Sequence, residues 1–154
     1  MELSDIIGVE AVRAPLRVSS KKRLLQDLAD MAEALYALPP VSTYKALMDR
    51  EGLGPTGVGR GVAIPHARFG DVKQVCGLFA RLDKPVDFEA VDRQPVDLVF
   101  ALFAPELAGA DHLKALARVS RTLRSEEICN KLRSTFEPAA LYAILTDDKA
   151  SEAA

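Results

Sequence analysis

The stretch most capable of chemistry runs from Gly52 to Phe69 and reads GLGPTGVGRGVAIPHARF. Five of the nine glycines lie between Gly52 and Gly61, where they permit positive φ angles and close approaches of the backbone. The short apolar run 62–64 follows and should anchor as a strand, which Pro65 prevents from continuing as a regular ladder. We therefore expect the next residue, His66, to leave a sheet on a stiff segment beside a flexible loop rich in amides. Such a position is a common setting for chemistry.

Three kinds of glycine-rich loop are open to this stretch. A Walker A loop needs Gly-Lys-Ser/Thr at the start of a helix, but Gly61 is followed by Val-Ala-Ile-Pro. A dinucleotide-binding fingerprint needs a strand before the glycines and a helix after them, and the order expected here is the reverse. The remaining interpretation is a loop that shapes a shallow pocket over His66, with the amides of Gly57, Gly59 and Gly61 facing a bound anion.

The histidines and arginines near this loop suit phosphoryl chemistry. A neutral His66 is a nucleophile towards phosphorus if a carbonyl or carboxylate holds the proton on one ring nitrogen and leaves a lone pair on the other. His112, the other histidine, follows a predicted helix cap at Asp111, and the positive helix end keeps its ring neutral and able to donate one N–H. Arg50 and Arg60 bracket the glycines and are able to supply positive charge to a phosphoryl group.

Each of these residues also has an interpretation without chemistry. His66 is then a surface residue of a turn, and His112 only begins its helix. Arg50 is favourable at a helix C-terminus for dipole reasons alone, and Arg60 is a solvated loop residue. Two histidines without ligand spacing do not make a metal site, so we expect neither a metal nor a cofactor.

Two helices are predicted before the glycines. Apolar residues with helical spacing predict the first helix, with one of the serines at 19–20 as its cap and the prolines at 39–40 as its end. The second is expected to run from Ser42 to Gly52, which serves as its C-cap. Arg50 then lies in the last turn of this second helix, immediately before the glycines.

The strands are predicted from short apolar runs. One strand is expected within 12–18, and a turn at 69–71 should precede another at 75–82, which Pro85 ends. The run 96–103 is almost entirely apolar without strict alternation, which is typical of a strand covered on both faces.

Three helices are predicted after the strands, beginning at Asp111, Ser125 and Pro138. The first of them is expected to carry Leu113, Leu116, Ser120 and Leu123 on one side. Because helices alternate with strands, we expect an α/β fold with a mixed sheet flanked by helices in three layers. It should form a single domain over 1–146, and the polar stretch 147–154 should be a disordered tail.

The composition predicts a globular cytoplasmic protein. Apolar residues make up 49% and charged residues 27% of the 154 residues. The net charge of −2 gives no basic field for nucleic acid. The acidic start, 1–5, does not read as a signal peptide, and no apolar run approaches the roughly 20 residues of a membrane-spanning helix. Cys76 and Cys129 have no metal or redox spacing, so reduced thiols are expected.

The segment TGVGRGVAIPHARF, residues 56–69, resembles the phosphorylation-site signature of the fructose/mannitol-type enzyme IIA domain of the bacterial sugar phosphotransferase system. The similarity continues through PVDFEAVDRQPVDLVFALFAP, residues 85–105, and DHLKALARVSRTLRSEEICNKLRS, residues 111–134. These later segments look most like the stand-alone nitrogen-regulatory branch. The resemblance extends over residues 3–145 and implies a mixed sheet flanked by helices.

The resemblance also implies a role for each candidate residue. His66 matches the phosphoacceptor, which takes a phosphoryl group from a small histidine phosphocarrier protein. Arg50 matches the arginine ahead of the loop that stabilises charge, and His112 the second active-site histidine, which orients and stabilises the phosphoryl group. Arg60 stands where the family often has asparagine or an acid, and Ala67 where glycine is common. Both departures bear on how the carrier docks.

Two classes of function are compatible with the resemblance. In one, a sugar-specific enzyme IIA of fructose/mannitol type relays the phosphoryl group to an enzyme IIB during sugar uptake. In the other, the phosphorylation state of His66 selects downstream regulatory proteins, which we expect because 154 residues leave no room for a fused membrane domain or enzyme IIB. The docking surface should surround His66 and include Phe69, with no role for nucleic acid or membrane insertion. A plain ligand-binding domain built on the glycines is the third possibility.

Overall fold

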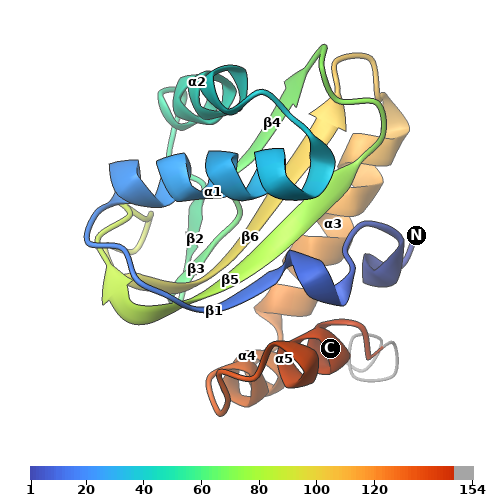
Figure 1. The fold of residues 1–154 in the computed structure, drawn as a ribbon. Helices are drawn as coiled ribbons and strands as arrows, with labels where there is room; N and C mark the ends of the chain where they lie inside the picture. The colour runs from blue at the N-terminus through green and yellow to red at the C-terminus, as the bar shows by residue number, and fades with distance from the viewer. Residues whose placement is uncertain (148–154) are drawn as a thin grey trace.

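A mixed sheet of six strands lies at the centre of residues 1–147, which the computed structural model describes (Figure 1). The strand order is β1-β5-β6-β3-β2, with β4 also paired to β6. The strands are β1 (Val12–Leu16), β2 (Gly57–Gly59), β3 (Val62–Ala63), β4 (His66–Phe69), β5 (Cys76–Val86) and β6 (Val96–Pro105). The predicted tail at 147–154 lies, beyond Asp147, outside the described residues.

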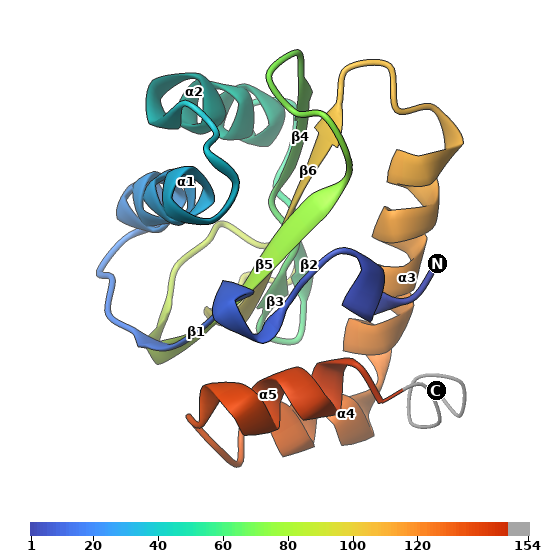
Figure 2. The same cartoon turned by 45° about the vertical axis from the view of Figure 1, so that its right-hand side comes forward.

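Helices cover both faces of this sheet, as the sequence predicts (Figure 2). One face carries α1 and α2, the other carries α3, and α4 and α5 lie together beside β1. The helices are α1 (Lys21–Tyr36), α2 (Pro40–Glu51), α3 (Ala110–Arg124), α4 (Glu126–Leu132) and α5 (Pro138–Leu145). Two short 3-10 helices, Leu3–Asp5 and Val9–Ala11, precede β1.

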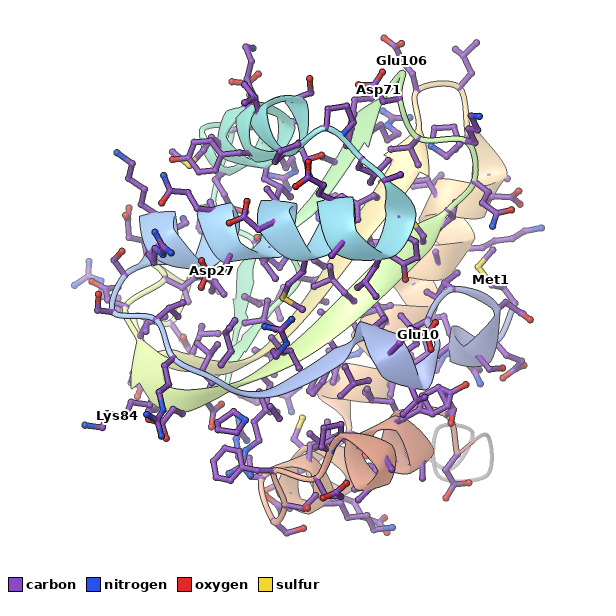
Figure 3. All side chains as sticks on the ribbon, viewed as in Figure 1. Met1, Glu10, Asp27, Asp71, Lys84 and Glu106 are labelled. Carbon is purple, nitrogen blue, oxygen red and sulfur yellow. The ribbon has the colours of Figure 1, made fainter. Side chains whose placement is uncertain are left out.

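The central strand of the core is β6, which pairs antiparallel with β5 and parallel with β3 and β4. All residues from 98 to 104 are fully buried, which confirms the prediction of a strand covered on both faces. Side chains fill the space between the sheet and the helices, and Asp71 and Glu106 mark the edge where β4 and β6 end (Figure 3). The predicted end of β5 at Pro85 is wrong, because the register shift before Val86 accommodates a proline within the strand.

Strands β3 and β4 follow one line along β6. Val62 lies opposite Leu98 and His66 opposite Leu102, so the register is the same on both sides of the interruption. Pro65 has no N–H to donate, but its carbonyl accepts the N–H of Leu102 at 2.9 Å. The sequence predicts an exit from the sheet at His66, and this is wrong. Because the carbonyl of Pro65 keeps the chain bonded to β6, His66 begins a new strand, β4, held in register by the core.

The glycine-rich stretch forms a hairpin, β2–β3, rather than a flexible loop. Its two turn residues, Arg60 and Gly61, have φ angles of 58° and 78°, and positive φ at both positions is what a two-residue hairpin of type I′ requires. Asparagine, one of the residues that the resembling family often has at the position of Arg60, adopts this conformation more readily than arginine does. Gly57 lies so close to Ala90 that a side chain has no space. Gly61 therefore permits the tight turn of the hairpin, and Gly57 permits the close contact with Ala90.

Most helix boundaries agree with the sequence prediction. The side chain of Ser20 caps α1, and that of Ser125 caps α4, each by accepting a backbone N–H in the first turn. Pro138 begins α5, as expected. Helix α2 begins at Pro40 rather than Ser42, because proline has no N–H and the first helical position needs none.

Helix α3 departs from its prediction in two ways. It follows Gly109, whose φ is 59°, and Asp111 lies in the first turn without capping it. The predicted apolar side is right only in part, since Leu123 is buried and Leu116 packs against the core, whereas Leu113 is 66% exposed. The buried side of α3 contains polar residues, which a pattern of apolar residues does not reveal. The residues that α3 buries are His112, Ala115, Arg118, Val119, Thr122 and Leu123.

Replacing Gly57 by alanine should destabilise the fold. The added Cβ would stand 2.7 Å from the Cβ and 2.9 Å from the Cα of Ala90, so we expect a loss of about 1–3 kcal/mol in the free energy of unfolding. The matched control is Gly70→Ala, whose Cβ would stand 3.6 Å from the nearest atom, a carboxylate oxygen of Glu106. Urea unfolding of the two variants measures the difference, and equal stabilities would contradict this account of Gly57.

Candidate functional site

An open cleft of about 740 Å³ lies between α2, β4 and the start of α3. Strand β4 contributes residues 66–69, and α3 contributes His112. Leu53 completes the lining, together with five residues of α2, which are Ser42, Lys45, Ala46, Asp49 and Arg50. The structure thus brings together four of the predicted site residues, His66, His112, Arg50 and Phe69.

His66 is half-buried at the start of β4 and has a defined tautomer. Its Nδ1 lies 2.8 Å from the carbonyl oxygen of Ile64. Because a carbonyl only accepts hydrogen bonds, the neutral ring carries its proton on Nδ1 and its lone pair on Nε2. This is the arrangement that a nucleophilic imidazole needs.

Arg50 lies against the other nitrogen of this ring. Its Nε is 3.3 Å from Nε2 of His66 and donates towards the lone pair. Its Nη1 donates to the carbonyl oxygen of Gly54 at 2.9 Å, which anchors the guanidinium beside the cleft. Arg50 lies in the last turn of α2, as predicted, and its charge is therefore available to an anion bound at Nε2.

The surroundings of His66 keep its ring neutral. Burial lowers the pKa of His66 below its usual value, and the positive charges of Arg50 and Arg68 lower it further. The hydrogen bond to Ile64 and the carboxylate of Glu51 act in the opposite direction. The net direction is downward, so Nε2 keeps its lone pair at neutral pH.

His112 faces His66 across the cleft, with ring centroids 5.7 Å apart and ring planes tilted by 43°. Its side chain is buried, 6% exposed, in the first turn of α3. Burial lowers the pKa of His112, and the nearby His66 and Arg68 add to this. Its Nδ1 is buried without a hydrogen-bond partner among residues 1–147. Since an unpaired buried N–H is costlier than an unpaired acceptor, we place the proton on Nε2.

The glycines of the hairpin and Arg60 are not in this cleft. Gly57, Gly59 and Gly61 are absent from its described lining, so the pocket over His66 that they were expected to shape is not formed by them. The backbone N–H of Arg60 donates to Asp92 at 2.8 Å, and its Nη1 donates to a carbonyl of α3 at 2.9 Å. The hairpin lies beside the first residues of β6, whereas His66 lies opposite Leu102, further along the same strand.

The cleft also contains residues that sequence reasoning missed. Arg68 lines it because side chains two positions apart share one face of a strand, and Arg68 follows His66 in β4 by that spacing. Lys45 and Asp49 pair with each other at 2.8 Å on the exposed side of α2. Reading 66–69 as a strand would have identified Arg68, whereas the sequence prediction ends the strand before His66 and places a turn at 69–71.

Other kinds of site find little support in the described residues. Within 1–147, no group of three or more histidines, cysteines or carboxylates could hold a metal ion. None of the helices in this range is both long and apolar enough to cross a membrane. Cys76 and Cys129 are free and buried, as expected, and burial raises the pKa of the Cys76 thiol to about 11.

Comparison with known proteins identifies the family. The model of the phosphoenolpyruvate-dependent sugar phosphotransferase system EIIA 2 domain matches residues 5–148. A nitrogen regulatory protein of Bradyrhizobium diazoefficiens is 50% identical over 145 residues, covering 94% of this chain and 95% of the relative. The chain therefore belongs to the EIIA 2 family of the phosphotransferase system, and the resemblance predicted from the sequence is confirmed.

Solved structures agree with this assignment. The crystal structure of the nitrogen regulatory protein IIA-Ntr from Neisseria meningitidis has a TM-score of 0.88 and 36% sequence identity, covering 94% of this chain and 99% of that one. The crystal structure of IIA mannitol from Escherichia coli has a TM-score of 0.78 at 20% identity, covering 90% and 98%. The second likeness supports the fold, and the first supports the nitrogen-regulatory branch as well.

The lowered pKa values of the two histidines predict a pH dependence of stability. The folded state binds fewer protons than the unfolded state, so the contribution to stability is full above the usual histidine pKa of 6.5. It is lost as the pH falls from there through the folded pKa values. Urea unfolding between about pH 7.5 and 5.5, above the carboxylate range, should show this decline.

The His112→Gln variant isolates one part of this decline. It removes one titrating ring, so its stability should fall less steeply over the same interval than that of the wild type. A wild-type stability that stays constant or rises as the pH falls through 6.5 would contradict the lowered pKa values.

Proposed function

We propose that this protein is a phosphoryl-accepting regulatory enzyme IIA of the nitrogen-related phosphotransferase system, with His66 as its phosphoacceptor. The observation that carries the proposal is the tautomer of His66. Its Nδ1 proton is donated to the carbonyl of Ile64, and its Nε2 lone pair opens on the cleft beside Arg50. The donor is a histidine phosphocarrier protein that carries a phosphorylated imidazole of its own.

The transfer needs no change in the protonation of His66. The Nε2 lone pair of His66 forms the new N–P bond while the N–P bond to the carrier breaks, and that electron pair returns to the carrier's ring nitrogen. The Nδ1 proton of His66 stays on its hydrogen bond to Ile64 throughout. Arg50 is close enough to turn from Nε2 to the phosphoryl oxygens, where a guanidinium offers several donors.

His112 and Arg68 are the other two residues that bind the phosphoryl group in this proposal. The Nε2–H of His112 donates to a phosphoryl oxygen, and the ring is held rigidly because its side chain is buried in α3. Arg68 shares the cleft and supplies a second positive charge on the same face of β4. Both groups are already placed in the unphosphorylated protein, so little reorganisation accompanies transfer.

The regulatory role follows from what phosphorylation does to the cleft surface. The cleft lining includes two apolar side chains that reach solvent, Leu53, which is 85% exposed, and the half-buried Phe69, and both suit an apolar protein face. A phosphoryl group adds about −1.5 to −2 charges at this point. An apolar partner would have to desolvate that charge, so we expect regulatory targets to prefer the unphosphorylated form. The carrier must use the same surface to bring its phosphorus to Nε2.

The phosphorylation assay tests the proposal directly. Incubation with a phosphorylated histidine phosphocarrier protein should place one acid-labile phosphate on wild-type protein and none on His66→Ala. His112→Ala should still accept phosphate, but more slowly by about 30- to 1000-fold, because one lost donor to developing charge costs about 2–4 kcal/mol of barrier. Both variants should still unfold cooperatively in thermal melts, with His66→Ala close to the wild type and His112→Ala at a lower temperature, because only the second change removes a buried side chain. Acid-labile phosphate on His66→Ala would overturn the assignment.

A pair of surface variants tests the docking surface. Phe69→Glu places a charge at the edge of the cleft, whereas Val91→Glu places one on an exposed apolar residue outside it. We expect Phe69→Glu to raise the carrier concentration needed for half-maximal transfer and to weaken retention of cytosolic targets, with Val91→Glu unchanged in both. Targets should also be lost when wild-type protein is phosphorylated. Equal retention of phosphorylated and unphosphorylated protein would favour a relay, as in a sugar-specific enzyme IIA.

A further inference from the structure

The carboxylate of Glu51, the last residue of α2, is nearly completely buried although it lies behind the cleft rather than in it. Its side chain is 5% exposed. Oε1 lies 3.0 Å from Nζ of Lys21 in α1 and accepts the backbone N–H of Thr56 at 3.1 Å. Oε2 accepts the hydroxyl of Thr56. Three donors therefore converge on one carboxylate and join α1, α2 and the segment that leads into β2.

A chain of hydrogen bonds runs from this carboxylate to the ring of His66. Glu51 holds Thr56 by its N–H and its hydroxyl. The carbonyl of Thr56 accepts the N–H of Ile64 at 2.9 Å. The carbonyl of Ile64 accepts the Nδ1 proton of His66 at 2.8 Å. Each link fixes the orientation of the next, so the acceptor that sets the tautomer of His66 depends on Thr56.

A second branch from Glu51 reaches the other side of the same ring. The contact with Thr56 closes the short loop 52–56 behind α2. Within this loop, the N–H of Gly54 donates to the backbone carbonyl of Glu51 at 3.1 Å. The carbonyl of Gly54 in turn accepts from Nη1 of Arg50 at 2.9 Å. The closed loop thus holds the guanidinium that donates to Nε2 of His66.

We propose that Glu51 is a positioning residue for the phosphoacceptor. It does not touch the reacting atoms; it fixes both hydrogen-bond partners of the His66 ring, the carbonyl of Ile64 and the guanidinium of Arg50. The kinetic part of this inference rests on the function proposed above. The part that concerns the resting ring of His66 is independent of that function.

Lys21 makes the buried carboxylate tolerable. Its side chain is 15% exposed, and its Nζ lies 4.6 Å from the centre of the Phe88 ring as well as against Glu51. Removing Glu51 alone would therefore leave a partly buried ammonium without its partner, which is strongly destabilising. A test of positioning must separate this loss of stability from the loss of geometry at His66.

Thr56 offers the cleanest variants, because it changes the chain of hydrogen bonds without changing a charge. Thr56→Val keeps the shape but removes the hydroxyl that Glu51 accepts, while Thr56→Ser keeps the hydroxyl. Misplacement of a reacting group by about 1 Å can cost about 100-fold in rate, so Thr56→Val should lower the maximal rate of phosphoryl acceptance about 10- to 100-fold. The carrier concentration for half-maximal rate should stay unchanged, and Thr56→Ser should restore the rate.

The resting ring provides a readout that needs no phosphoryl transfer. Nitrogen-15 NMR of the imidazole should show the proton of wild-type His66 on Nδ1. In Glu51→Gln and Thr56→Val it should show a larger fraction on Nε2, since the Ile64 acceptor is less well held. In Glu51→Gln the pKa of His66 should also fall further, because a negative charge that raises it is gone while Arg50 and Arg68 remain.

Two controls separate positioning from stability. Asp97→Asn removes a partly buried carboxylate from Arg133 near the start of β6, and it should destabilise the fold without changing the tautomer of His66. The double variant Glu51→Gln/Lys21→Met removes both charges, so it should regain stability relative to Glu51→Gln while its phosphoryl acceptance stays slow.

The outcomes are distinct. A wild-type tautomer and rate in both Thr56→Val and Glu51→Gln/Lys21→Met would overturn the inference. So would losses in all variants, Asp97→Asn included, that follow the free energy of unfolding alone. If wild-type protein accepts no phosphoryl group from the carrier, the proposed function fails, and the NMR measurements still decide whether Glu51 positions His66.

Discussion

The hydrogen bond from Nδ1 of His66 to the carbonyl of Ile64 is the interaction on which the site depends. Donor and acceptor are two residues apart, with Pro65 between them, so the bond forms only if the backbone holds one conformation at this point. Residues 64–66 are held in that conformation by their neighbours, because β3 and β4 both pair with the buried strand β6 in one register. The buried position of β6 thus fixes the backbone of β3 and β4, and this backbone fixes the orientation of the His66 ring.

The charges around this ring have two effects at once. Burial lowers the pKa of His66, Arg50 and Arg68 lower it further, and together they keep a lone pair available at neutral pH. In the function proposed above, the same cations meet the phosphoryl group at His66, so no charge has to be brought in. Glu51 opposes them from behind the cleft, where its carboxylate raises the pKa of His66 while holding the loop beside it. The phosphorylated state that we propose would therefore use the same contacts as the resting state.

Local sequence signals were sufficient for part of this structure. His66, His112 and Arg50, which the structure brings together in one cleft, were predicted as site residues because each lies beside a strong local feature: a proline, a helix start and a helix end. The strand β6 was recognisable from an apolar run that no surface strand would tolerate. Both kinds of signal are contained within a few neighbouring residues, so they can be recognised in the sequence before the fold is known.

The remainder depends on partners that are distant in the sequence. Gly57 is small because Ala90 lies against it, and the conformation of Arg60 follows from a hairpin whose second strand pairs with β6. Glycine content alone does not distinguish a tight hairpin from an anion-binding loop, so the predicted pocket was wrong. Arg68 and Glu51 were missed because their roles depend on a strand register and on a lysine in α1. The exposed Leu113 likewise misled the prediction of α3, since buried histidine and arginine carry no hydrophobic signal.

The common line of β3 and β4 along β6 has a consequence for how such a domain can diverge. His66 is held in register by the buried strand β6, whereas five of the other cleft residues lie on α2 and His112 lies on α3, at the opposite face of the sheet. Substitutions on the outer sides of these helices reshape the rim without reaching the register at His66. The surface around the cleft is therefore able to change while the position of the His66 ring stays the same.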